Sequence, residues 1–112
     1  SERACGFESH LGHVGRRLLE RKLRDVSARL RKLREELGIT EEQLSVFADD
    51  AHEKGVRALV SETPYAAFEY QDAQRHAETL TKSRDAIVRD ISELEARQDE
   101  LLDKLAVFSA QD

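Results

Sequence analysis

The chain is poor in the residues that build a compact globular core or brace one covalently. Its 112 residues include no tryptophan, one proline, one cysteine and six aromatic side chains. A single cysteine, Cys5, cannot form an internal disulfide, and a globular enzyme usually carries more aromatic residues. No apolar run approaches the roughly 18 residues that cross a bilayer, so we expect a soluble, cytoplasmic protein that does not bind membranes.

What the chain does contain is a pair of heptad patterns that mirror each other about Glu62. Apolar residues recur at alternating spacings of three and four on both sides, and positions whose numbers sum to 124 would face each other, as Leu30 faces Leu94. The positions before Glu62 are Leu19, Leu23, Val26, Leu30, Leu33, Leu37, Leu44, Phe47 and Ala51. Those after it are Ala73, Ala77, Leu80, Ile87, Ile91, Leu94, Leu101, Leu105 and Phe108. This pattern predicts an all-α protein, a long antiparallel helical hairpin of the coiled-coil type.

Two places along the chain carry signals that end or start a helix. Gly38 could form a left-handed cap, and Thr40 with Gln43 could form a capping box. Thr63 before Pro64 gives the strongest stop in the sequence. We therefore expect helices over about 14–37, 41–60 and 64–108. Because the heptad phase continues past Gly38, we favour a kink or short break there, with a compact three-helix arrangement as the alternative.

The first thirteen residues fit neither heptad and contain two glycines. We expect residues 1–13 to be a disordered arm, with 14–112 forming a single helical-hairpin domain. The arm could also be non-native, since a GTG start codon at Val14 would place the true start after it.

Positive charge is concentrated in the first helix. Residues 15–34 hold nine basic and two acidic residues, a net charge of +7, whereas the whole chain carries −5. The simplest interpretation is that this basic helix lies beside an acidic return helix. The alternative is a surface that binds nucleic acid. Its candidate residues are Arg16, Arg17, Arg21, Arg24 and Arg31.

Some apolar residues fall outside the heptad seam. These are Leu18, Ile39, Val46, Val60, Val88 and Leu102. A simple two-helix hairpin would leave them in water, so a homodimer in the form of a four-helix bundle or a different protein partner could cover them. The region 49–72 around the turn holds three of the six aromatic residues and is the best candidate contact surface. The candidate partner-binding residues are Tyr65, Phe68, Tyr70, Val88 and Leu102.

No arrangement of residues predicts catalysis, a cofactor or a metal site. Cys5, His10 and His13 lack a fourth ligand, and the carboxylates of Asp49 and Asp50 are typical of a solvated helix surface. Neither a phosphate-binding glycine loop nor a recognisable nucleophile arrangement is present. The sequence thus predicts a non-enzymatic interaction or scaffold protein that binds a protein partner, with nucleic-acid association as the alternative.

Three stretches, 16–23, 59–64 and 94–102, resemble a family of small, functionally uncharacterised coiled-coil proteins of high-GC actinobacteria. The excess of thirteen arginines over five lysines fits such a genome. The resemblance implies a fold and a lineage and supplies no activity.

Overall fold

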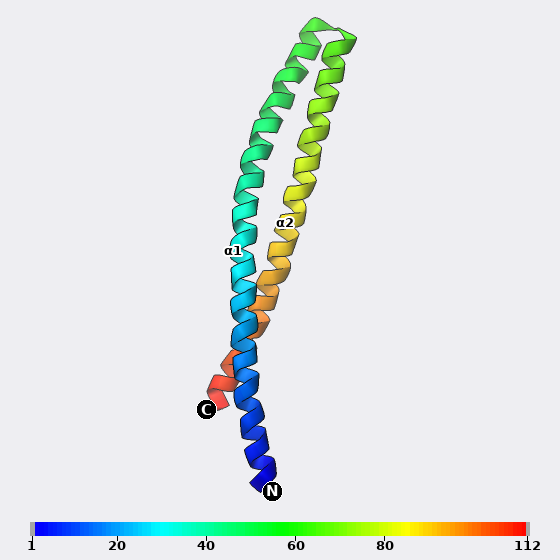
Figure 1. Cartoon of the computed structure of the whole chain (residues 1–112). Helices are drawn as coiled ribbons and strands as arrows, with labels where there is room; N and C mark the ends of the chain where they lie inside the picture. Colours follow the sequence, from blue (N-terminus) through cyan, green and yellow to red (C-terminus); the bar gives the residue numbers. More distant parts are fainter. Residues whose placement is uncertain (1, 112) are drawn as a thin grey trace. The chain divides into compact units, whose positions relative to one another are not determined.

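The chain folds into two long helices. The computed structural model describes the backbone of residues 2–111 and the side chains of residues 15–109. Helix α1 spans Glu2–Ser61 and helix α2 spans Pro64–Gln111, with Glu62 and Thr63 between them (Figure 1). No strand occurs in the described residues. The predicted all-helical hairpin is confirmed, with two helices in place of the three that we expected.

The break expected near Gly38 is absent, and that prediction was wrong. Residues 2–61 form one continuous α-helix, and no described glycine has a positive φ. A Cβ added at Gly38 would meet nothing within 4 Å, so this glycine lies on an open face and serves no close contact. Leu37 and Leu44 on either side are half-buried. Their packing keeps the helix intact at a propensity cost of about 1 kcal/mol for the glycine.

The helix also extends into the segment that we expected to be a loose arm. The assigned helix begins at Glu2, while the side chains of residues 1–14 lie outside the described residues. Whether residues 1–13 belong to the native protein stays a prediction.

The turn is built by the residues that the sequence indicated. The Glu62 amide donates to the Ala58 carbonyl at 3.1 Å, and the φ of Glu62 is 50°, which is the left-handed cap of a helix C-terminus. The Ala66 amide donates to Thr63 Oγ1 at 3.2 Å, so Thr63 caps α2 and Pro64 takes its first position. The point of the sequence mirror is therefore the turn itself.

Replacing Glu62 by glycine should stabilise the hairpin. A left-handed conformation costs a residue with a side chain about 1 kcal/mol, and glycine avoids that cost. We expect Glu62→Gly to raise the free energy of unfolding by about 0.5–1 kcal/mol, measured by urea denaturation. Glu62→Ala is the matched control, because it removes the same carboxylate and keeps the strain. Equal stability of the two variants would contradict the prediction.

Two compact units make up the chain, and we describe each by itself. The terminal unit comprises Ser1–Lys32 and Ile91–Asp112, and the tip unit comprises Leu33–Asp90. In the terminal unit, the buried side chains come from both helices: Val26 and Leu30 from α1, and Ile91 and Leu101 from α2. The Gln98 amide donates to Ser27 Oγ at 3.1 Å beside them. These residues form a narrow apolar seam with no buried polar side chain among those described.

The tip unit has a seam of smaller side chains. Its buried residues are Leu33, Ala51, Ala66 and Ala73, so alanine fills most of the seam near the turn. Alanine lets two helix backbones approach closely but removes little apolar area from water. Large apolar residues near the turn therefore have to lie outside the seam.

The side-chain contacts across each unit follow the mirror to within one residue. Phe108 lies against Gly15 and Gln98 bonds to Ser27 in the terminal unit. In the tip unit the ring of Phe47 meets His76 edge-on at 5.9 Å, and Tyr70 lies against Gly55. The numbers of each pair sum to 123 or 125, one either side of the expected 124.

Candidate functional site

An exposed apolar cluster surrounds the turn. Val56, Leu59 and Val60 come from the last turns of α1, and Tyr65 and Phe68 from the first turns of α2. Leu59 and Val60 are each 80% exposed, Tyr65 71% and Phe68 62%. We call these five residues the tip cluster. Isolated exposed apolar side chains are ordinary, but five large ones within thirteen residues of the turn are an unusual concentration, and exposed apolar surface of this kind is typical of interaction sites.

The seam explains why these side chains face solvent. Ala66 is buried and Ala58 is half-buried near the turn, so small residues fill the space between α1 and α2. Leu59 and Val60 follow Ala58 on the helix and point away from that space. The local sequence therefore fixes the tip cluster on the outside of the hairpin.

Tyr70 differs from the tip cluster because the hairpin partly covers it. Its ring lies so close to Gly55 that an added Cβ would be 2.8 Å from Cε1. Its hydroxyl accepts a hydrogen bond from Gln74 Nε2 at 2.8 Å. Tyr70 lines a groove of about 270 Å³ together with His52, Gly55, Val56 and Leu59. It therefore forms one wall of a recess that borders the tip cluster.

The region that holds the tip cluster is acidic. Residues 49–72 include six acidic and two basic residues, a net charge of −4. Glu53, Glu62 and Asp72 are exposed and Glu69 is half-buried. The region 49–72 therefore combines exposed apolar side chains with a net negative charge.

Lys54, one of the two basic residues in the region 49–72, forms an ion pair within α1. Lys54 Nζ lies 3.0 Å from Asp50 Oδ2, and this hydrogen bond raises the pKa of Lys54 above its ordinary value. Because the pKa is raised, the stability that depends on the Lys54 charge is present at neutral pH and is lost when Lys54 deprotonates in strong alkali. The contribution is small, since both side chains are partly exposed.

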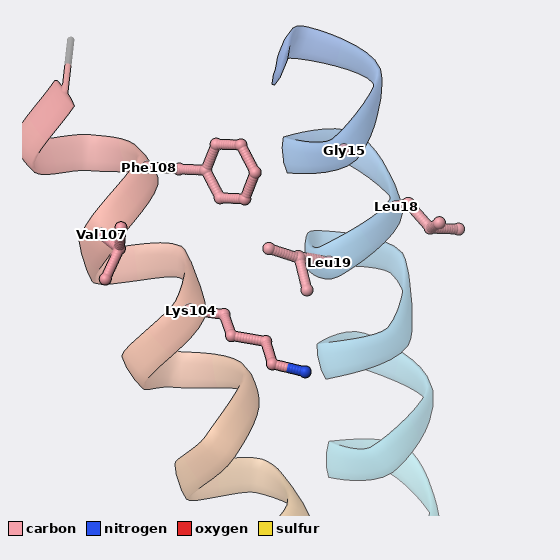
Figure 2. A pocket seen from close by; sticks show the side chains of 6 residues that line it. All are labelled: Gly15, Leu18, Leu19, Lys104, Val107 and Phe108. Carbon is pink, nitrogen blue, oxygen red and sulfur yellow. The ribbon is translucent and has the colours of Figure 1, made fainter. Parts of the chain in front are cut away.

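A second apolar groove lies in the terminal unit. It has a volume of about 380 Å³ and is lined by Gly15, Leu18, Leu19, Lys104, Val107 and Phe108. Figure 2 shows the Phe108 ring directed at α1 near Gly15 and the Lys104 side chain extending toward α1 beside Leu19, whereas Leu18 points away from α2. The groove is shallow and apolar, and Lys104 is the one ionisable residue among those that line it.

The residues predicted to lie outside the seam are exposed. This holds for Leu18, Ile39, Val46, Val60, Val88 and Leu102, and also for Tyr65 and Phe68. Val88 and Leu102, at 47% and 46% exposure, lie in different units. Sequence reasoning missed Val56, Leu59 and Val107, which are exposed as well. Their exposure could have been predicted, because none of the three occupies a seam position of the heptad.

The predicted basic residues are also on the surface. Arg17, Arg21, Arg24 and Arg31 are exposed. Arg16 is half-buried and its Nε lies 3.7 Å from Glu20 Oε1. Arg17, Arg21, Arg24 and Arg31 are therefore more exposed than Arg16.

The described polar side chains form no arrangement typical of a metal-binding or catalytic site. Among the described residues, no three His, Cys, Asp or Glu side chains are grouped to hold a metal ion. Cys5, His10 and His13 lie outside the described side chains. Arg84, which stands at a seam position, donates from Nη2 to Asp85 Oδ1 at 3.0 Å. In the described part of the chain, no helix is both long and apolar enough to cross a membrane.

Comparison with family models, curated proteins and solved structures found no match to this chain. The resemblance to an actinobacterial coiled-coil family therefore rests on the sequence stretches alone.

Proposed function

We propose that this chain is a non-enzymatic interaction protein whose hairpin tip binds a protein partner. The observation that carries the proposal is the tip cluster, in which five large apolar side chains are held outside an alanine seam. Exposing them to water is unfavourable, whereas burial of each in a partner would contribute about 1.5–3 kcal/mol. Tyr65 and Phe68 are suited to act as anchors, because aromatic side chains are enriched in protein interfaces.

The charges around the tip cluster favour a partner of a different kind from the chain itself. The region 49–72 has a net charge of −4, so two tips placed together would bring like charges face to face. Such juxtaposition disfavours a tip-to-tip dimer. A cleft with an apolar floor and basic side chains along its edge would complement the tip in both shape and charge.

Paired substitutions test the tip. Leu59→Ser with Phe68→Ser should abolish capture of a partner from cells that make the protein, while Leu18→Ser with Leu102→Ser should not. With the captured partner purified, the tip variant should bind at least about thirtyfold more weakly, because a central anchor contributes about 2 kcal/mol or more. Isothermal titration calorimetry measures this difference. Circular dichroism of both variants checks that the helices remain folded.

Two outcomes of this experiment would overturn the proposal. If both variants retain every captured protein, or if only the Leu18 and Leu102 pair loses it, the tip is not the binding surface. Complementarity with a basic cleft also requires that added salt weaken the complex. Complete insensitivity to salt would remove the basic edge from the proposal.

Homodimerisation is a separate proposal that Val88 and Leu102 support. Each is about half exposed in its own unit, and a four-helix dimer could bury them. Sedimentation velocity of the intact chain tests this, with Val88→Ser and Leu102→Ser expected to shift a dimer to the monomer.

A further inference from the structure

Four arginines form a line along the outer face of α1 in the terminal unit. Arg17, Arg24 and Arg31 are seven residues apart, and Arg21 lies four residues after Arg17. At 3.6 residues per turn, these spacings put all four on one face. Val26 and Leu30 are buried on the opposite side. We call these four residues the arginine stripe.

The arginine stripe has no ion-pair partner among the side chains that the structure describes. All four side chains are exposed, and none has a hydrogen bond or ion pair with another described side chain. The expected pairing with an acidic return helix therefore does not engage these residues. Their charge is available to a ligand without any rearrangement of the hairpin.

The other charged residues of α1 near the arginine stripe add to its positive charge. Between residues 15 and 32, α1 carries eight basic and two acidic residues, a net charge of +6. Residues 91–109 of α2 carry five acidic and two basic residues, a net charge of −3. The terminal unit thus has one basic face, and its carboxylates lie mainly on the other helix.

We infer that the arginine stripe binds the phosphate backbone of a nucleic-acid duplex, independently of sequence. The stripe consists of guanidinium groups, which bind phosphate through two hydrogen bonds each. Three of them span about 21 Å of rigid helix at 1.5 Å per residue. A duplex carries one phosphate per roughly 3.4 Å of its axis on each strand, a finer spacing than that of the arginines, so binding does not require one fixed register.

An acidic protein surface, including α2 of a second copy, fits less well. No large apolar side chain interrupts the arginine stripe, because the one other residue on its line is Ala28. Protein interfaces take most of their affinity from buried apolar and aromatic anchors, and exposed ion pairs contribute only about 0–1 kcal/mol each. A polyelectrolyte is different, since it releases condensed counterions and binds through charge alone.

Fluorescence anisotropy with a mixed-sequence DNA duplex of about 30 base pairs tests the inference, with an RNA duplex of equal length beside it. We expect a dissociation constant on the order of 10⁻⁵ M at low salt. Four phosphate contacts give a slope of about −3.6 for the logarithm of affinity against the logarithm of salt concentration. Affinity should therefore fall roughly a hundredfold between about 50 and 200 mM salt. A preference between the two duplexes identifies which nucleic acid supplies the phosphates.

A matched pair of double variants assigns the effect to the arginine stripe. Arg17→Ala with Arg31→Ala removes two charges fourteen residues apart, and Arg75→Ala with Arg89→Ala does the same on exposed positions of α2 in the tip unit. The stripe variant should reduce the salt slope by about 1.8. The α2 variant should leave it unchanged, and Arg17→Lys with Arg31→Lys should restore most of it.

Three results would overturn the inference: no duplex binding at low salt, equal losses in the two double variants, or tighter binding of poly-L-glutamate than of either duplex. The last would assign the arginine stripe to an acidic protein. None of these results bears on the tip cluster, because the stripe and the tip lie in different units.

Discussion

Replacing Leu30 by alanine should cost about 3 kcal/mol of stability, within the 2–5 kcal/mol found for buried leucines. Leu30 is 1% exposed and is the one described large side chain that is almost completely buried. Among its described side chains, the terminal unit has only three others that are buried. The loss is therefore a large share of the stability that so narrow a seam can supply.

The matched control is Leu59→Ala, which deletes the same atoms from a side chain that is 80% exposed. It should change the free energy of unfolding by no more than about 0.5 kcal/mol. Urea denaturation followed by far-ultraviolet circular dichroism measures both variants. Equal losses in the two would mean that Leu30 does not occupy the seam and that the heptad assignment is wrong.

The seam and the turn could be predicted because their signals are local and mutually consistent. Thr63 and Pro64 belong to a short motif whose capping chemistry works the same way in most proteins. The heptad positions repeat over many turns, so single exceptions do not shift the register. Contacts such as Phe47 with His76 then fall within one residue of the expected pairing.

Gly38 shows where local signals fail. Glycine followed by Thr40 and Gln43 has the chemistry of a helix end, but each of these residues is also tolerated inside a helix at modest cost. The half-buried Leu37 and Leu44 gain more from a continuous helix than the caps would gain from a break. Packing between helices decided the outcome, and sequence propensity alone does not measure that packing.

The tip cluster was predicted in part, for a related reason. Tyr65 and Phe68 are aromatic and drew attention by their type, whereas Val56 and Leu59 resemble ordinary helix residues. Only the finding that Ala66 and Ala73 fill the seam shows that these larger residues have no place inside it. The contact between Tyr70 and Gly55 was not predicted either, because neither residue is among the apolar heptad positions on which the sequence analysis depended.

Replacing Gly55 by alanine should destabilise the tip, although alanine is the better helix former. The new Cβ would lie 2.8 Å from Tyr70 Cε1 and 3.3 Å from Cδ1 and Cζ, so the ring has to move. Overpacking of this kind costs about 1–3 kcal/mol, against a helix-propensity gain of about 1 kcal/mol. We expect a net loss of about 1 kcal/mol for Gly55→Ala.

Gly38→Ala, in the same unit, should change the free energy of unfolding in the opposite direction. Nothing lies within 4 Å of its added Cβ, so the propensity gain of about 1 kcal/mol should appear undiminished. The two glycine substitutions should then differ by about 2 kcal/mol in urea denaturation, although each adds the same methyl group to α1.

A double-mutant cycle identifies Tyr70 as the cause. In a Tyr70→Ala background the ring is gone, and Gly55→Ala should become stabilising by about the same amount as Gly38→Ala. The coupling between positions 55 and 70 should therefore be about 2 kcal/mol. If Gly55→Ala stabilises the chain that retains Tyr70, the ring does not rest on Gly55, and the groove beside the tip cluster lacks the wall assigned to it.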